Sequence, residues 1–446
     1  MTRLNNTGTP SRKHMLLGVA VMLLGLAALV PLAAYAGGNA FSMPETEWDG
    51  HLKIYTRAIF PRSGTAYDAV GLAPNRDGFA EFRLNNKTFF NTAAYTEIHY
   101  EALAGGGGTR KDGEDLRMLY PDVFSTGLFG PPDDDRRFFD LTRVIHEDRE
   151  TMSYHRLDRA MVAFTPAWGE IRLGRQAVTW GNGFTFNPMD LFNPFAPTDL
   201  ERDYKTGDDL ALIQFPVRDM DVELIYVVRR DPDTGDAGLD ENSLGVKLHM
   251  FKGEVELDVM ATRHYEDMVT GMGITGDLGG AAWRGDITAT FLDDASRGRS
   301  AYISAVANMD YSWVWLDKNW YGYIELYYNG LSDADYTDHF SDPALADRIA
   351  RGELFALGRV YASANLNLEV HPLVNAYATP IVNLEDGSGT FLPRVVYDYA
   401  DNIRITATAS LSWGGSETEY GGYDIPGTAF EARPADSIAA WCTWYF

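Results

Sequence analysis

The sequence holds few side chains that could carry out covalent chemistry. The sequence has nine histidines, and His99, His155, His249 and His264 are among those that fall in segments that we predict to be strands. No Gly-x-Ser-x-Gly or other nucleophile signature accompanies them, although Ser153 is close to His155 in the chain. Nucleophilic catalysis needs a nucleophile with a base in hydrogen-bond reach. The pattern therefore argues against a hydrolase, and we predict that the chain is not an enzyme.

Redox and metal chemistry also lack their usual motifs. The single cysteine, Cys442, cannot form an internal disulfide, and there is no Cys-x-x-Cys-His for covalent haem. Acidic runs at residues 133–135, 333–347 and 417–424 contain no twelve-residue calcium-site pattern. We interpret these runs as solvated loops. We therefore expect no cofactor and no bound metal.

The chain is strongly acidic. Its 38 basic and 63 acidic residues give a formal charge of −25, and removal of the first 36 residues leaves 35 basic residues and a charge of −28. Such a protein has no basic face with which to release the counterions of a polyanion. Nucleic acid is therefore excluded as a partner.

The amino-terminal residues have the pattern of a secretory signal peptide. A segment with three basic residues and no acid precedes an apolar run over residues 15–30, and the small-x-small sequence Ala-Tyr-Ala follows at residues 34–36. This pattern predicts a signal peptide over residues 1–36. The alternative is a retained membrane anchor, because the apolar run approaches spanning length.

The remaining residues, 37–446, show no second run of eighteen apolar residues. If the mature chain spans a membrane, it must do so with strands, and only a closed barrel satisfies every strand hydrogen bond in lipid. No linker, repeat or low-complexity block divides these 410 residues, which exceed the usual size of a single soluble core. We expect one large barrel domain over residues 37–446.

The last twelve residues alternate with a period of two. Ile438, Ala440, Cys442, Trp444 and Phe446 fall on one face of the predicted strand. An edge strand of a soluble sheet is the alternative, but an exposed apolar strand at a chain end would be an aggregation hazard. The stretch resembles the closing strand of outer-membrane β-barrels, which ends on Phe with an aromatic residue two positions earlier. That resemblance implies that the barrel-assembly machinery reads Trp444 and Phe446.

Segments of about ten residues that alternate between polar and apolar side chains fill most of the chain. Residues 51–60 form the first of them and residues 254–261 the clearest, and others cover residues 170–179 and 354–369. A soluble sheet with one wet face would alternate in the same way. Because the count is about eighteen, an even number as in single-chain bacterial barrels, we predict an all-β, transmembrane antiparallel barrel with polar residues toward the lumen.

The predicted connections sort into two sets. With the amino end in the periplasm, alternate joints are short, and the other set holds every long loop, at residues 62–76, 105–150, 180–207, 331–351 and 414–434. Short periplasmic turns and long extracellular loops are typical of outer-membrane barrels. A soluble protein would have no reason to obey this parity.

One long loop differs from the others in composition. Residues 179–207 contain Phe184, Phe186, Phe192 and Phe195 together with three prolines. The segment is too apolar for an exposed loop and too rich in proline for a spanning strand. We predict that it folds inward and constricts the lumen, which would otherwise be open water. The alternative is a compact cap on the extracellular rim.

The residues around this loop carry a family resemblance. Leu173 to Gln176, Trp180-Gly181 and Asn187 to Phe195 resemble a group of Gram-negative outer-membrane barrels and are distantly similar to the alginate-export-type porins. The resemblance implies an eighteen-stranded barrel that conducts a solute passively across the outer membrane. Those exporters share a lumen rich in arginine and lysine, as an acidic polysaccharide requires. Here the predicted lumen mixes both signs, so we do not carry the alginate substrate over.

Basic, amide and aromatic side chains on the predicted inner faces and in the loop are our candidates for the lumen lining and the constriction. They are Lys53, Arg57, Arg83, Arg172, Arg175, Gln176, Trp180, Phe184, Phe186, Arg202, Arg284 and Arg404.

The sequence thus predicts a porin or channel for passive transport in the outer membrane of a Gram-negative bacterium. The expected partners are outer-membrane lipid and lipopolysaccharide, the barrel-assembly machinery, and a small-molecule or oligosaccharide solute. The alternative is the barrel scaffold of a larger complex, such as the sheath of an electron conduit. That alternative gains weight if residues 179–207 cap the rim instead of filling the lumen.

Overall fold

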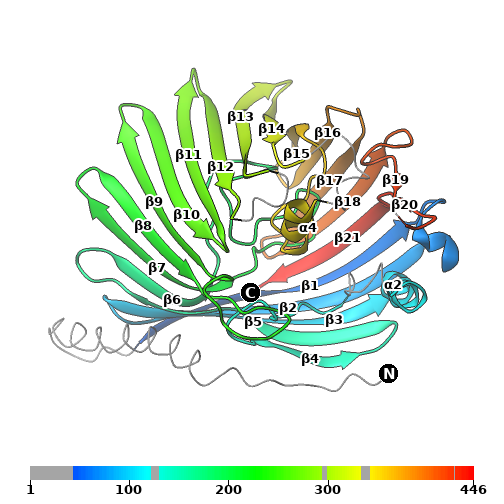
Figure 1. The fold of residues 1–446 in the computed structure, drawn as a ribbon, viewed down its shortest axis with the longest axis horizontal. Coiled ribbons are helices and arrows are strands. Elements are labelled where there is room, and N and C mark those ends of the chain that lie inside the picture. Colours follow the sequence, from blue (N-terminus) through cyan, green and yellow to red (C-terminus); the bar gives the residue numbers. More distant parts are fainter. Residues whose placement is uncertain (1–43, 122–129, 294–298, 333–341, 426) are drawn as a thin grey trace.

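The structure is a computed structural model that describes residues 44–121, 130–293, 299–332, 342–425 and 427–446. The predicted signal peptide lies outside the described residues. The described chain forms one closed, antiparallel barrel of eighteen strands (Figure 1), which confirms the predicted fold class and strand number. None of the described helices is long and apolar enough to cross a membrane.

The barrel strands follow one another in chain order around the ring. They are β1 (Glu45–Phe60), β2 (Asn75–Asn91), β3 (Ala94–Gly107), β5 (Thr151–Phe164), β6 (Glu170–Gln176), β7 (Asp208–Val217), β8 (Met220–Val227), β9 (Ser243–Lys252), β10 (Val255–His264), β11 (Asp267–Leu278), β12 (Ala281–Phe291), β13 (Ala301–Trp315), β14 (Lys318–Asn329), β15 (Val360–His371), β16 (Val374–Asn383), β17 (Gly389–Ala400), β18 (Ile403–Trp413) and β21 (Asp436–Tyr445).

The carboxy-terminal strand closes the barrel, as predicted. β21 pairs with β18 on one side and with β1 on the other, in a register that runs from His51 opposite Tyr445 to Phe60 opposite Asp436. The blue and red ribbons therefore lie side by side in Figure 1. Trp444 is 46% exposed on the outer surface, whereas its neighbour Thr443 is 2% exposed. The two faces of the strand are thus those that the alternation predicted.

The connections divide between the two ends of the barrel, which also confirms the predicted parity. The short set comprises residues 92–93, 165–169, 218–219, 253–254, 279–280, 316–317, 372–373 and 401–402. The other end carries the long connections at residues 61–74, 108–150, 177–207, 330–359 and 414–435.

The long connections contain structure that the sequence analysis missed. They hold η1 (Ala66–Ala69), α2 (Gly108–Leu119), β4 (Thr142–Glu147), α4 (Pro343–Ala350), β19 (Tyr423–Asp424) and β20 (Glu431–Ala432). At α4, the Asp342 side chain accepts the backbone N–H of Ala344 at 2.8 Å, and Pro343 occupies the first helical position. These are standard helix-start signals. They were hidden in a segment that we had interpreted as a solvated acidic loop.

Two strands are shorter than predicted because the chain turns away from the wall. The segment predicted at residues 170–179 ends at Gln176, and the one predicted at residues 354–369 begins only at Val360. In both places the omitted residues pack inside the barrel, where Val178 is 8% exposed and Ala356 is 1% exposed. Apolar side chains that we had assigned to strands therefore belong to the contents of the lumen.

Candidate functional site

Residues 177–207, which we call the crossing loop, traverse the interior of the barrel. The loop leaves β6, and its Thr185 hydroxyl lies 2.8 Å from the Ser363 hydroxyl of β15. β15 is nine strands from β6 in the ring of eighteen, so the two strands are diametrically opposite. The prediction of an inward fold is therefore confirmed, and the alternative of a cap on the rim is wrong.

A carboxylate on the far wall holds the tip of the crossing loop. Glu325 of β14 accepts three consecutive backbone N–H groups, from Phe184 at 2.6 Å, Thr185 at 3.0 Å and Phe186 at 2.9 Å. The Asn308 amide of β13 also donates to it, at 3.3 Å. A loop that enters a barrel must find partners for its backbone groups. Glu325 supplies them for three residues at once.

A second carboxylate binds the crossing loop just before its tip. Asp286 of β12 accepts the backbone N–H of Asn182 at 2.5 Å and the side-chain amide N–H of the same residue at 3.0 Å. Within the described residues neither Asp286 nor Glu325 forms an ion pair. Hydrogen bonds to a charged group each contribute about 1.5–3 kcal/mol. We call these two carboxylates the acidic clasp.

Aromatic stacking also holds the tip of the crossing loop against the wall. Phe184 stacks on Tyr323 with ring centroids 4.5 Å apart, and Phe186 stacks on Tyr327 at 4.6 Å. The Arg284 guanidinium carbon lies 4.9 Å from the centre of the Phe184 ring. Stacked pairs of this kind contribute about 0.5–1.5 kcal/mol beyond the area that they bury. The tip is therefore held by its backbone and by its side chains.

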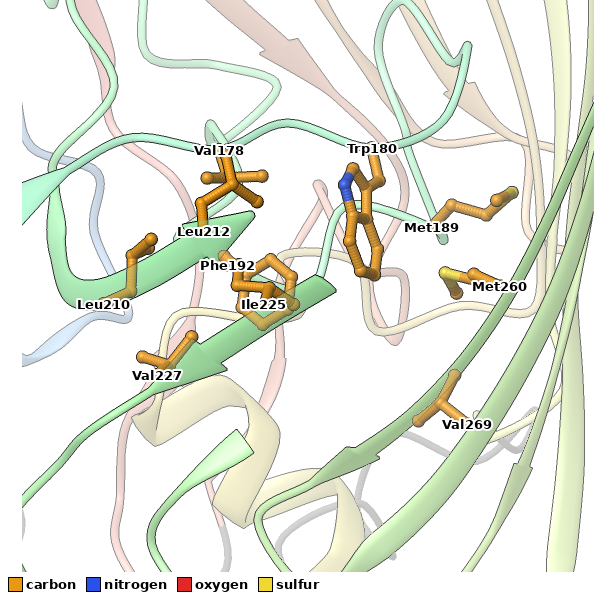
Figure 2. Close-up of a cluster of buried hydrophobic side chains, with 10 residues drawn as sticks. All are labelled: Val178, Trp180, Met189, Phe192, Leu210, Leu212, Ile225, Val227, Met260 and Val269. Atoms are coloured by element: carbon orange, nitrogen blue, oxygen red, sulfur yellow. The ribbon is translucent and has the colours of Figure 1, made fainter. Parts of the chain in front are cut away.

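A hydrophobic core lies between the crossing loop and strands β7, β8, β10 and β11 (Figure 2). Trp180 is 1% exposed, lies edge to face with Phe192 at 5.3 Å, and donates its indole N–H to Glu223 at 2.8 Å. The core consists of Val178, Trp180, Met189, Phe192, Leu210, Leu212, Ile225, Val227, Met260 and Val269.

This core corrects the expectation that every strand turns a polar face to the lumen. Leu210 and Leu212 of β7 point inward, while Ala211 and Ile213, which alternate with them, lie on the outer face. Both faces of β7 are apolar because one meets lipid and the other meets the crossing loop. A strand that is covered on both faces reads as a continuous hydrophobic run and not as an alternation.

Lys205, near the end of the crossing loop, binds the start and the middle of the same loop. The Lys205 ammonium lies 2.5 Å from an Asp190 carboxylate oxygen, and it also donates to the Val178 carbonyl at 2.5 Å and to the Thr179 hydroxyl at 3.2 Å. Burial raises the pKa of Asp190 to about 6, against the opposing effect of Lys205, and burial also lowers the pKa of Lys205. Because desolvation offsets much of the attraction, the pair mainly fixes the geometry.

The end of the loop, residues 198–205, runs back along β1 and β2, and we call it the return limb. Lys53 of β1, 2% exposed, donates to the Asp203 carboxylate at 2.9 Å and to the Glu201 carbonyl. Arg57 lies 3.5 Å from the Glu201 carboxylate. Burial raises the pKa of Glu201, and the positive charge of Arg57 opposes that shift. The return limb is therefore attached to the wall through its own acids.

Tyr204 completes this attachment. The guanidinium carbon of Arg83 lies 4.0 Å from the centre of the Tyr204 ring, and His51 stacks on the same ring at 5.9 Å. Arg83 is held in turn by Asp158 at 2.8 Å and by Glu101 at 3.4 Å. The polar inner face predicted for β1, β2 and β3 is present here, and it meets a polar limb of the loop.

An open cavity of about 1070 Å³ remains beside the return limb. One wall is the charged face of β1–β3 and β5. Next to it around the ring, on the other side of β21, β17 and β18 contribute the small hydroxyl side chains Thr390, Thr408, Ser410 and Ser412. The open part of the lumen is thus off centre, between the return limb and the seam where the barrel closes.

A second long connection is bound to strands β10 and β11, which contribute to the hydrophobic core. In residues 330–359, Arg348 of α4 pairs with Asp267 at 2.5 Å, and Glu353 lies 3.1 Å from His264. Burial would raise the pKa of Glu353, but the neighbouring His264 and the nearby arginines hold it at about 2. The His264 ring also meets Phe192 of the crossing loop at 5.8 Å. This connection is therefore bound to the same wall residue, His264, that Phe192 of the crossing loop contacts.

The predicted site residues fall into three groups. Lys53, Arg57, Arg83 and Arg202 line the cavity. Trp180, Phe184, Phe186 and Arg284 belong to the crossing loop or touch it. The others lie elsewhere on the wall: Arg175 pairs with Asp134 and Asp209, Gln176 is 3% exposed beside it, Arg172 donates to Gln214, and Arg404 pairs with Asp398.

The two residues of the acidic clasp, Asp286 and Glu325, are not among the predicted site residues. In the sequence they are two of the many acids on a predicted lumen face that mixes both signs. A local signal was present at Glu325, which interrupts the inward series Tyr321, Tyr323 and Tyr327 on β14. A lone acid within an aromatic row needs donors, and here they are the Asn308 amide and the N–H groups of the loop folded against it.

No protein-family model and no curated protein matches the sequence. Solved structures do resemble the fold. Pseudomonas aeruginosa OccK5 (OpdH) has a TM-score of 0.50 and 9% identity, over 90% of this chain and 98% of that one. Acinetobacter baumannii OccAB1 has a TM-score of 0.48 and 9% identity, over 90% and 96%. A triple mutant of the Rhodopseudomonas blastica porin has a TM-score of 0.43 and 9% identity, over 90% and 100%.

Proposed function

We propose, from the premise that this chain folds as a porin-like outer-membrane barrel, that it is a channel for passive diffusion of a small polar or oligomeric solute. The observation that carries the proposal is the open cavity of about 1070 Å³ beside a crossing loop that spans the lumen. In a channel, a constriction of fixed shape selects solutes by size and by charge. The crossing loop is that constriction in our proposal.

The attachment of the crossing loop supports a rigid aperture. Its tip is held by the acidic clasp, its body by a hydrophobic core, and its return limb by Lys53 and Arg57. The alternative of a scaffold around a threaded partner needs a free interior. Since the crossing loop occupies that space, the contacts favour the channel.

The outer surface supports the membrane location and the lipid partners. Large apolar side chains are exposed on the outward faces of strands, among them Ile324 at 66% and Leu326 at 58%. Aromatic residues such as Trp315 and Trp320 cluster at the strand ends, as in the aromatic girdles of such barrels. We propose outer-membrane lipid and lipopolysaccharide as the surroundings and the barrel-assembly machinery as the folding partner.

Swelling of proteoliposomes tests the function directly. We expect liposomes that contain the mature chain to swell in an isotonic monosaccharide, and the rate to fall steeply from a disaccharide to a tetrasaccharide, because the crossing loop restricts the lumen to the cavity beside the return limb. Liposomes without protein provide the baseline. Swelling no faster than this baseline for every sugar would contradict the proposed function.

A further inference from the structure

The cavity beside the return limb has a lining whose formal charges cancel. Six basic and six acidic side chains line it. The bases are Lys53, Arg57, Arg83, Arg156, Arg202 and Arg433, and the acids are Glu81, Glu101, Asp199, Glu201, Asp203 and Glu419. Because the sum is zero, the field that a solute meets depends on which of these charges already has a partner.

Five of the six bases are neutralised by a carboxylate within 4.0 Å. The pairs are Lys53 with Asp203 at 2.9 Å, Arg57 with Glu201 at 3.5 Å, Arg83 with Glu101 at 3.4 Å, Arg156 with Glu101 at 2.9 Å, and Arg202 with Asp199 at 3.3 Å.

Arg433 is the exception. Within the described residues its side chain forms neither an ion pair nor a hydrogen bond, and its Nε–H is buried without an acceptor. Glu431, two positions earlier, also lies near Gly422 but does not come within ion-pair distance of Arg433. The side chain is half-buried at the cavity wall. It therefore brings a positive charge without an ion-pair partner among the described residues to the cavity wall.

The acid that balances Arg433 in the sum is out of reach of a solute. Glu419 is 7% exposed, and both of its oxygens are occupied. One accepts the backbone N–H of Leu357 at 2.9 Å, and the other accepts the Tyr361 hydroxyl at 2.5 Å and the Asn383 amide at 2.8 Å. The accessible part of the lining is thus positive at Arg433.

The position of Arg433 places this charge at the mouth. Arg433 precedes β21, which begins at Asp436 opposite Phe60, at the end of the barrel that carries the long connections. Arg57 and Lys53 lie deeper along β1, and the acids of the return limb already occupy them. A solute that enters from this end can bind Arg433 without displacing any group of the protein.

We infer that Arg433 is a binding site for an oxyanion group, a carboxylate or a phosphate, on the transported solute. This inference rests on the proposed channel function and names the class of solute. A guanidinium with unused donors matches the geometry of both oxyanions. Arg433 gives the channel its anion preference, because the deeper cations are compensated by Asp203 and Glu201.

Ion selectivity in a planar bilayer tests the inference. We expect the ratio of chloride to potassium permeability, measured from the reversal potential in a KCl gradient, to fall roughly three-fold or more in Arg433→Gln and to be largely kept in Arg433→Lys. Arg143→Gln removes the same charge from the exposed strand β4 and is the matched control. Equal ratios in wild type and Arg433→Gln, or an equal fall in Arg143→Gln, would overturn the inference.

Two probe anions identify the chemistry. Acetate and phosphate, added separately, should each reduce the wild-type current and lose most of this effect in Arg433→Gln; an effect of phosphate alone would restrict the site to phosphate. If the wild type gives no current, the channel proposal fails. In that case, calorimetric titration of the detergent-solubilised protein with the same anions still tests whether Arg433 binds them. Equal binding by wild type and Arg433→Gln would refute the site.

Discussion

Replacing both residues of the acidic clasp, as Asp286→Ala together with Glu325→Ala, will raise the single-channel conductance roughly two-fold or more, because the tip of the crossing loop loses its attachment to the far wall. Three backbone N–H groups lose their acceptor at Glu325, and the backbone and side chain of Asn182 lose theirs at Asp286. A released tip will also fluctuate, so the current should become noisier.

The control for this prediction is Glu369→Ala. Glu369 is a carboxylate on the neighbouring strand β15, and its partner is the exposed side chain of Asn319 at 2.9 Å. We expect its conductance to equal that of the wild type. If the double variant folds and conducts like the wild type, the crossing loop does not set the aperture, and the constriction must lie elsewhere.

Deletion of Phe446 will reduce the amount of folded barrel in the outer membrane roughly ten-fold, through loss of seam contacts and of the proposed assembly signal. Gly50 and Phe446 exchange two backbone hydrogen bonds of 3.1 Å each, at the end of the β1–β21 pairing. The Phe446 ring also stacks on Phe82 at 6.1 Å and meets Trp444 at 5.4 Å. The deletion therefore removes the backbone pairing with Gly50 at the end of the seam between β1 and β21.

Phe446→Tyr is the matched variant, since it keeps the backbone pair and the ring. We expect near-normal levels for it, measured as the heat-modifiable band in outer-membrane fractions. The few barrels that form without Phe446 should conduct normally, because the residue lies on the outer surface, 47% exposed. Normal levels of the deletion variant would show that neither the seam nor assembly depends on this terminus.

The wall of the barrel was largely predictable from local patterns. The face that carries Trp444 and Phe446, the closing role of β21 and the division between short and long connections all follow from alternation and turn residues. These features depend on lipid outside and water inside. The alternation is lost where the crossing loop replaces water, so β7 shows no alternation from Leu210 to Ile213.

The contents of the lumen were less predictable, because they depend on contacts between distant residues. The composition of residues 179–207 indicated an inward fold, but not the landing point at Glu325, which is 139 positions from Phe186. Arg433 is a second residue whose environment could not be predicted from the sequence around it. Nothing in its neighbourhood in the sequence distinguishes it from Arg202, and only the ion pairs reveal which of the two charges is compensated.

Single-channel conductance of the refolded mature chain in a planar bilayer tests the central claim most directly. The off-centre cavity beside a fixed crossing loop predicts steady currents that scale with salt concentration and are smaller than those of the variant that lacks the acidic clasp. Silent insertion of folded barrels, in the wild type and in that variant alike, would contradict the claim that this barrel is a diffusion channel.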